Sequence, residues 1–340
     1  MNKKKVLPLA LLGAVVLILA ILLLVLQTVD SSEEDTGIPL CSLNSGEVTS
    51  LYYRDASAEE PVEVSLTKTD GTWTLDSDPA LPIDQSKADA ITADLTALTA
   101  QRQLTDDADV EEMGFDDPTQ VITLSTGSDQ WELTVGSKNS MTDTWYVRTS
   151  EDGPVYTVSL TDLSDICKTP KQLYAAQDIT DIESDAITTM TVQSGGNTLS
   201  FTQTDGTWTL SDDPDYSLDQ DLVNTMANTI CDMTTDWSIT SPEADSTYGL
   251  DTPNVVVTIV SADGSVQCSF GGTDPEDDSL NYLRSSAASD VVYEVSSENL
   301  SAFAYDKASL KAATPESAET ADVVAEDPVG GADDFADATS

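Results

Sequence analysis

A string of seven residues, TDGTWTL, occurs twice in this chain, first at residues 69–75 and again at residues 204–210. The same offset of 135 residues relates Gly114 to Gly249, well outside the string. A repeat of this length indicates one folding unit present in two copies, and it constrains the fold more than any other feature. The chain length of 340 residues also suits two domains.

The N-terminus carries a membrane signal. Residues 6–26 form an unbroken apolar run without a charged side chain, and three lysines at positions 3–5 precede it. At about 1.5 Å per residue the run spans roughly 30 Å, enough to cross a bilayer. It is longer than the apolar core of a cleaved signal peptide, which favours a retained transmembrane helix. The positive charges predict residues 1–5 inside and the bulk of the chain outside the cytoplasmic membrane, in a single-pass topology.

The composition is strongly acidic, with 61 Asp and Glu against 14 Lys and Arg and a formal net charge of -47. Because such a surface repels phosphate groups, we expect no nucleic-acid partner. The chain has no histidine, which excludes Ser-His-Asp and Cys-His catalysis and the common zinc sites. Acidic residues are too abundant for paired carboxylates to mark an active site. We therefore expect no enzyme activity, no catalytic residues, and neither a cofactor nor a metal ion. The alternative for the acidic loops at 212–215 and 274–278 is calcium binding, although neither fits the EF-hand pattern.

The four cysteines, Cys41, Cys167, Cys231 and Cys268, include no C-x-x-C pair. A disulfide between Cys41 and Cys167 is compatible with an extracytoplasmic location, but nothing in the sequence selects it. Cys231 and Cys268 align with a helix position and a sheet-core position of the first copy. For these two cysteines we therefore favour the role of small buried hydrophobic residues.

The composition along the chain predicts the domain boundaries. Polar and acidic residues with Gly and Pro predict a flexible stalk at 27–46. The first copy of the repeat is expected at 47–173 and the second at 174–311. Residues 312–340 are mainly Ala, Glu, Asp, Thr, Pro and Gly without any basic side chain, which predicts a disordered acidic tail.

Each copy begins with a hairpin, in which alternating residues flank an Asp-Gly turn at 70–71 or 205–206. A helix follows, with an apolar face that includes Ile91 and Leu95 in the first copy and matching apolar residues in the second. Several further strands complete the copy. We predict an α+β fold of two tandem homologous units, each a mainly antiparallel sheet with one principal helix, after the N-terminal transmembrane helix.

The tryptophan of the repeated string is a candidate functional residue. Trp73 and Trp208 each lie on a strand between two threonines, so one face of the strand carries the indole and the other carries polar groups. An exposed aromatic platform for a ligand is one interpretation. Packing of the indole against the helix is the simpler account, and it is the one we favour.

A second candidate is a tyrosine and an arginine two residues apart on a strand, which places both on the same face. The pairs are Tyr146 with Arg148 and Tyr282 with Arg284. Each copy also carries an aspartate in a Gly-x-Asp-x-Pro loop, Asp116 or Asp251, and we interpret these as the carboxylate partners of the arginines. The alternative is contact of the Tyr-x-Arg pairs with a small anion or a peptide carboxylate.

The most specific element is the string YGLDTP at residues 248–253, which corresponds to GFDDP at residues 114–118. Together with the hairpin ending in Gly-x-Trp, the Tyr-x-Arg strands and the Val-Tyr strands, it resembles the domain of unknown function 4340 family, over roughly residues 47–311 as two copies. The first copy departs from the element by carrying Met113 and Phe115. The resemblance implies a bacterial envelope protein with one N-terminal helix, often associated with export-type ABC transporter components resembling those called gliding-motility auxiliary proteins. It implies no reaction.

These observations lead to one functional expectation. The chain is predicted to be a non-enzymatic, membrane-anchored extracytoplasmic binding or scaffold protein, accessory to an ABC-type export system, with membrane protein partners such as transporter components. The alternative is a free-standing surface module that binds cell-wall polymer or another ligand. The presence or absence of adjacent transporter genes discriminates between the two.

Overall fold

The computed structural model of the protein describes residues 37–58, 60–105 and 110–313. The predicted cytoplasmic segment and transmembrane helix, together residues 1–26, and nearly all of the predicted tail at 312–340 lie outside these ranges. Within the described ranges, no helix has the length and the apolar character needed to cross a membrane.

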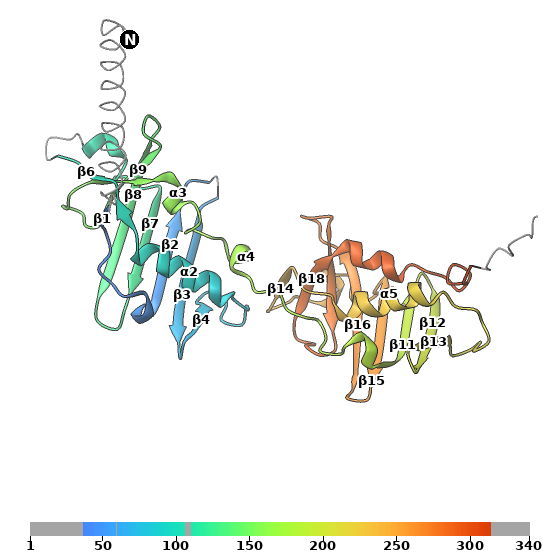
Figure 1. Ribbon diagram of the computed structural model, residues 1–340. Coiled ribbons are helices and arrows are strands. Elements are labelled where there is room, and N and C mark those ends of the chain that lie inside the picture. Colours follow the sequence, from blue (N-terminus) through green and yellow to red (C-terminus); the bar gives the residue numbers. More distant parts are fainter. Residues whose placement is uncertain (1–36, 59, 106–109, 314–340) are drawn as a thin grey trace, which may run out of the picture.

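Two eight-stranded sheets form the body of the described structure (Figure 1). The strand order is β4-β3-β2-β7-β8-β9-β10-β6 in the first unit and β13-β12-β11-β15-β16-β17-β18-β14 in the second, so the path of the chain is the same. Neighbouring strands are antiparallel throughout both sheets. The identical order confirms that the two copies of the repeat fold alike and that the fold is mainly antiparallel.

The bounds of the strands in the first sheet are β2 (Ser50–Asp55), β3 (Val62–Thr69), β4 (Thr72–Leu75), β6 (Arg102–Gln103), β7 (Gln120–Ser125), β8 (Gln130–Asn139), β9 (Thr144–Arg148) and β10 (Tyr156–Ser159). Those in the second sheet are β11 (Ile187–Ser194), β12 (Asn197–Thr204), β13 (Thr207–Leu210), β14 (Trp237–Ile239), β15 (Val255–Ser261), β16 (Ser265–Thr273), β17 (Leu280–Ser285) and β18 (Val292–Ser296). The remaining elements are β1 (Ile38–Pro39), β5 (Thr99–Ala100), the helices α2 (Gln85–Thr96), α3 (Leu160–Leu163), α4 (Pro170–Leu173) and α5 (Gln220–Cys231), and the 3-10 turns η1 (Ser45–Glu47), η2 (Val110–Met113), η3 (Ser184–Ala186), η4 (Asp245–Thr247) and η5 (Ser297–Phe303).

One long helix covers one face of each sheet, α2 in the first unit and α5 in the second (Figure 1). Both helices begin at an aspartate cap: the Asp84 carboxylate accepts from two backbone N–H groups of the first turn, and Asp219 does the same in α5. The buried side of α2 includes Ile91 and Leu95, which are 1% and 0% exposed. These helices therefore supply the apolar layer that the sheets need on one face.

The hairpin turn explains why the repeated string contains Asp-Gly. Asp70 and Gly71 both have positive φ, 51° and 86°, and Asp205 and Gly206 repeat these values at 50° and 77°. Two successive residues with positive φ form the turn that matches the twist of a two-residue β-hairpin, and Asp-Gly adopts it at low cost. The string therefore fixes the register of β3 with β4 and of β12 with β13.

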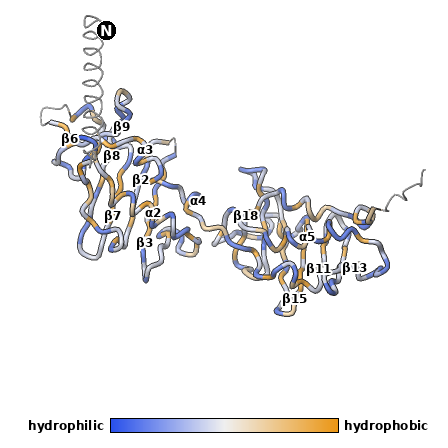
Figure 2. The backbone as a smooth tube through the Cα atoms, in the orientation of Figure 1, coloured by the Kyte–Doolittle hydropathy of each residue, from blue (hydrophilic) through white to orange (hydrophobic). Residues whose placement is uncertain are grey.

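Alternation along the strands separates the core from the outer face. Buried and partly exposed residues alternate along the whole of β7 and β15. Figure 2 shows the corresponding patches of hydrophobic residues along the strands and helices of both units. Each unit thus has its own main hydrophobic core between its sheet and its long helix.

The described part of the predicted stalk belongs to the fold. Ile38 and Pro39 form β1, which pairs with β5, and Leu40 and Leu43 pack against the core of the first unit. The prediction of a flexible stalk is therefore wrong for residues 37–46. The physical reason is that the apolar residues spaced along this segment find both backbone partners and a hydrophobic surface, which outweighs its Gly and Pro content.

Candidate functional site

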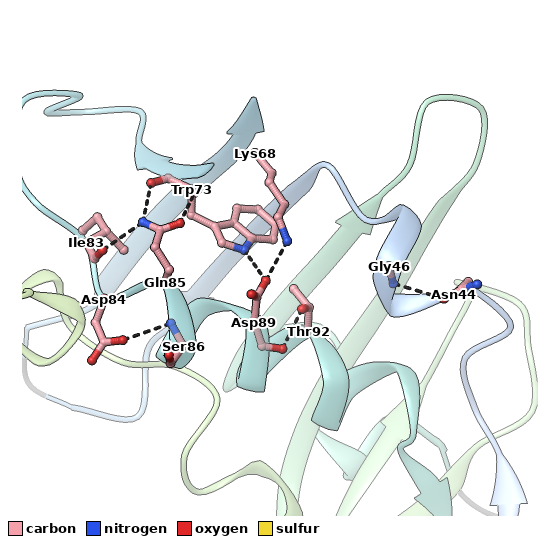
Figure 3. Close-up of polar contacts among 10 residues, drawn as sticks. All are labelled: Asn44, Gly46, Lys68, Trp73, Ile83, Asp84, Gln85, Ser86, Asp89 and Thr92. Atoms are coloured by element: carbon pink, nitrogen blue, oxygen red, sulfur yellow. Dashed lines mark hydrogen bonds and ion pairs between the residues drawn. The ribbon is translucent and has the colours of Figure 1, made fainter. Parts of the chain in front are cut away.

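The repeated tryptophans are buried structural residues. Trp73 and Trp208 are 2% and 1% exposed and belong to the cores formed with α2 and α5. The side chain of Gln85 holds Trp73 at both backbone groups, accepting from its N–H at 2.6 Å and donating to its C=O at 3.0 Å (Figure 3). Gln220 holds Trp208 in the same way. The interpretation that the indoles pack against the helix is confirmed.

The two indoles differ in the partner of the ring N–H. Trp73 Nε1 donates to Asp89 at 2.8 Å, and the same carboxylate oxygen pairs with Lys68 at 2.7 Å (Figure 3). These contacts from Lys68 and Trp73 lower the pKa of Asp89. In the second unit Trp208 Nε1 donates to the neutral Asn224 at 2.9 Å. The network satisfies a buried N–H donor in both units, with an ion pair added only in the first.

The Tyr-x-Arg residues lie on the sheet face opposite the long helix. Tyr146 belongs to a small cluster with Met113, Phe115 and Val155, while its neighbour Val147 points into the main core. Matching residues of the second unit form an equivalent cluster, which consists of Tyr248, Leu250, Val292, Ile239 and Tyr282. Both units therefore carry a second, smaller cluster where the specific Gly-x-Asp-x-Pro loop packs onto the outer face of the sheet.

Each arginine is held within its own unit, but by different groups. Arg284 pairs with Asp245 at 2.9 Å and also donates to the backbone carbonyl of Ser289. Arg148 donates to the carbonyl of Glu151 at 2.9 Å, and its guanidinium lies over the ring of Phe115, 4.6 Å from the centroid. The arginines thus brace the turn that follows their strand. These contacts give both arginines a structural role, while the Nε–H group of each guanidinium is buried without a hydrogen-bond partner among the described residues.

The prediction that Asp116 and Asp251 are the carboxylate partners of the arginines is wrong. Both are exposed, and within the described residues neither forms an ion pair with an arginine. The reason is the alternation of the loop: Phe115 and Leu250 turn into the small cluster, which directs the following aspartate to solvent. In the first unit the ring of Phe115 also occupies the place beside the guanidinium.

The tyrosines of the two Tyr-x-Arg pairs also make contacts within their own units. Tyr146 Oη accepts from the side-chain amide of Asn139 at 2.7 Å. The ring of Tyr282 packs edge-on against Tyr248, with centroids 5.0 Å apart. Burial, and then the nearby carboxylate of Asp274, raise the pKa of Tyr282 to about 12, so its hydroxyl stays protonated at neutral pH.

The glycines of the specific loop are explained by close backbone approach. Gly249 has φ of 67° and its Cα lies against the bulge of β16, where an added Cβ would come within 2.9 Å of Gly272 N. Gly272 N donates to the carbonyl of Tyr248 at 2.8 Å, which ties the loop to the strand. A Cβ on Gly271 would overlap that same carbonyl oxygen. Gly114 and Gly136 repeat this arrangement in the first unit, so the element locks a turn onto a sheet.

Metal binding and cysteine reactivity are the remaining kinds of chemistry that the sequence raised. Among the residues that the structure describes, no group of three or more Cys, Asp and Glu side chains is arranged to hold a metal ion. All four cysteines are free thiols, so Cys41 and Cys167 are not joined here. Burial raises the pKa of Cys167 and of Cys268 to about 12, which keeps both as unreactive thiols.

The profile of the family described as Domain of unknown function (DUF4340) matches residues 73–215 and residues 208–325. The chain belongs to the DUF4340 family. The two matches begin at Trp73 and Trp208, the same position of the repeat, which lies in the last strand of the hairpin. The first match runs on through the hairpin of the second unit, so the bounds of the two matches do not coincide with the bounds of the two sheets. Neither a curated protein nor a solved structure matches the chain.

Several residues form contacts between the two units that the sequence does not reveal. The hydroxyl of Tyr174 lies 2.6 Å from the hydroxyls of both Thr235 and Ser238, all three buried. The ring of Trp237 packs on Tyr174 with centroids 5.3 Å apart. Lys311 takes the place of Tyr174 in the second unit, as the bridges Ile83–Tyr174 and Leu218–Lys311 show. The sequence signal that could have indicated Tyr174 is that the second copy has a different residue, Lys311, at the equivalent position.

Two polar contacts extend this junction. Thr240 Oγ1 donates to Asp78 at 2.6 Å, joining the second unit to the loop before α2. Lys171 of α4 pairs with Glu294 of β18 at 3.6 Å. Figure 1 shows the chain crossing between the units through α4, beside β14 and β18.

The structure predicts a modest role for the Arg284 ion pair. Arg284→Ala is expected to lower the free energy of unfolding by about 1–2 kcal/mol, because it removes a hydrogen bond to a backbone carbonyl and part of the packing. The coupling to Asp245, whose side chain is 52% exposed, should stay below about 1 kcal/mol. A double-mutant cycle of Arg284→Ala and Asp245→Ala, measured by denaturant unfolding, tests this. A coupling of several kcal/mol would contradict it.

Proposed function

We propose that this DUF4340 protein is a non-enzymatic, membrane-anchored scaffold or binding protein that presents two similar modules outside the cytoplasm, as an accessory of an ABC-type export system. Its partners are then membrane proteins such as the transporter components. The apolar run at 6–26 and the lysines before it support the anchor and the orientation. The alternative is a free-standing surface module that binds cell-wall polymer.

The observation that carries the proposal is the junction between the units. Domains joined only by a linker are expected to move relative to each other. Here a buried hydroxyl cluster around Tyr174, an aromatic pair with Trp237 and the hydrogen bond from Thr240 to Asp78 oppose such motion. Contacts that restrain the two modules at their junction suit a protein that holds partners at a set distance.

Capture in native membranes tests the proposed partners. A photoreactive amino acid is placed at Asp116 or at Asp251, exposed positions that correspond in the two units. We expect transporter components among the captured proteins, with a preference for one of the two positions. Cross-linking to wall polymer instead would support the alternative, and capture of neither would overturn the scaffold proposal. Free probe without protein is the control.

Accessibility tests the orientation. Protease added to cells stripped of their outer layers should digest the chain after residue 27 and spare the N-terminus, provided that cytoplasmic markers survive. Protection of both units together with those markers would place them inside and reverse the proposed topology.

Tyr174→Phe is expected to weaken the junction. The substitution removes one hydroxyl and leaves those of Thr235 and Ser238 buried without it, which costs about 1–3 kcal/mol. Calorimetry should show the two units unfolding less cooperatively, and limited proteolysis should cut faster near the linker. Tyr52→Phe is the matched control, because Tyr52 makes only an exposed hydrogen bond. Equal behaviour of the two variants would contradict a stabilising junction.

Glu294 predicts a pH dependence of the junction. Burial raises the pKa of Glu294 above its ordinary value of 4.5, and the nearby carboxylates of Asp274 and Asp236 act in the same direction, while Lys171 lowers it. The folded state therefore binds this proton more tightly than the unfolded chain does. The resulting stabilisation is complete below the unfolded pKa and is lost as the pH rises through the raised folded pKa.

Glu294→Gln removes the loss of stability that ionisation of Glu294 causes in the parent as the pH rises. We expect the variant to have a higher Tm than the parent at pH 7, and the difference to shrink towards about pH 4, where the parent carboxyl is also protonated. Calorimetry at several pH values measures it. Asp251→Asn, on an exposed loop, is the control for the general effect of removing one negative charge. A lower Tm at pH 7 would show that the pair with Lys171 outweighs burial.

A further inference from the structure

A hollow of about 700 Å³ lies at the end of the first unit, between the segment at 42–47 and the hairpin that joins β7 to β8. Its size is within the range of about 300–1,000 Å³ that is usual for small-ligand sites. Trp131, only 8% exposed, lines it, and its ring is fixed because Nε1 donates to the carbonyl of Leu40 at 2.8 Å. The hollow is therefore shaped by an immobile aromatic residue.

The rest of the lining is polar. One wall carries Ser42, Asn44 and Glu47, and the other carries Asp129 and Gln130. The side-chain carbonyl of Asn44 accepts from Gly46 N at 3.1 Å (Figure 3), which orients its amide and leaves the two N–H donors. The two walls thus offer carboxamide donors and acceptors together with carboxylate acceptors around one indole.

The second unit supplies an internal comparison. Leu40 N donates to Leu98 O as Ile179 N donates to Met233 O, so η1 corresponds to η3. By this register Glu47 is replaced by Ala186, while the repeat offset replaces Gln130 by Ser265 and Trp131 by Val266. The same fold therefore forms without these three side chains. Their presence in the first unit alone is not required by the architecture.

We propose that this hollow binds a segment of a neutral, N-acetylated oligosaccharide. Carboxylates at Glu47 and Asp129 disfavour anionic ligands, and the polar walls disfavour purely apolar ones. Sugar hydroxyls donate to carboxylates, and an acetamido group pairs with the carboxamides of Asn44 and Gln130, which have the same donors and acceptors. The acetyl methyl, rather than a whole sugar ring, contacts the small part of Trp131 that stays exposed, because Trp131 is 8% exposed and otherwise packs in the core.

The inference rests on the proposed extracytoplasmic placement, because glycans of this kind are met there. The binding test itself does not depend on that placement, because it uses the purified protein. The full-length protein, in a zwitterionic detergent without a sugar headgroup, is titrated with chitotetraose and, as the control ligand, with maltotetraose. We expect saturable binding of chitotetraose, followed by calorimetry, and at least about tenfold weaker binding of maltotetraose. Equal binding of the two, or no binding of chitotetraose, would overturn the site.

Variants locate the binding. Gln130→Ser and Glu47→Ala install the residues of the second unit at exposed positions, and each should weaken chitotetraose binding by about tenfold without changing the Tm. Trp131→Val should abolish it, with folding checked separately. Ser265→Gln is the matched control in the second unit and should leave the affinity unchanged. Unchanged affinity in Gln130→Ser and Glu47→Ala would disprove the site, whereas failure of the capture or protease experiments would leave it intact and remove only the scaffold proposal.

Discussion

Trp73→Ala is expected to lower the free energy of unfolding of the first unit by about 3–5 kcal/mol, the usual cost of deleting a large aromatic side chain from a core. Trp73 is 2% exposed and packs in the cluster between sheet and helix. The loss also frees Asp89 from the indole N–H and removes part of the surface that Lys68 covers. Denaturant unfolding followed by far-ultraviolet circular dichroism measures the loss as a shift of the transition to a lower denaturant concentration.

Trp73→Phe is the matched control. It keeps an aromatic ring in the core but removes the donor to Asp89, so a loss of about 1 kcal/mol is expected, well short of the alanine variant. Trp208→Ala should act on the second unit as Trp73→Ala acts on the first, because Trp208 is equally buried. An exposed ligand platform would behave differently: its alanine variant would leave the free energy of unfolding almost unchanged, and that result would refute the structural role.

The architecture could be predicted because the signals that carry it are local and occur twice. Asp70-Gly71 fixes a hairpin by its backbone conformation, and the apolar face of residues 85–96 predicts a helix that must cover a sheet. The second copy, with the same pattern at the same offset, then makes a shared strand order the natural expectation. None of this needs knowledge of distant contacts.

The arginine partners could not be predicted in this way. Asp116 and Asp251 satisfy the repeat offset, but the repeat records only what the two copies share. Phe115 stands where the second copy has Leu250, and Val110 stands where it has Asp245. Arg148 therefore lies over a ring, whereas Arg284 pairs with a carboxylate 39 residues away, on Asp245. The choice of partner follows from three-dimensional packing that sequence spacing does not record.

The same reasoning applies to the junction and to the hollow. Tyr174 and Glu294 act between units, so they lie at positions where the copies differ, and a search for shared residues passes over them. Trp131, which is replaced by Val266 in the second copy, is missed for the same reason. In a duplicated chain, shared residues mainly specify the fold, whereas differences between the copies indicate what each unit does separately.

Gly136→Ala is the second substitution with a large expected effect. A Cβ at this position would overlap the carbonyl oxygen of Met113, a backbone atom that cannot rotate away. Either the loop that ends at Gly114 lifts from the bulge of β8, or the strand bends. We expect a loss of about 2–4 kcal/mol in the free energy of unfolding of the first unit, from overpacking together with disrupted backbone hydrogen bonds.

Gly127→Ala is the control for this prediction, because a Cβ there meets nothing within 4 Å and the residue lies in the same unit. It should leave the free energy of unfolding within about 0.5 kcal/mol of the parent. Gly271→Ala should repeat the loss in the second unit, where the added Cβ meets the carbonyl of Tyr248. If Gly136→Ala and Gly127→Ala unfold alike, the loop does not press on the strand. The most specific sequence element of the family would then have to be explained by a bound partner instead of by the fold.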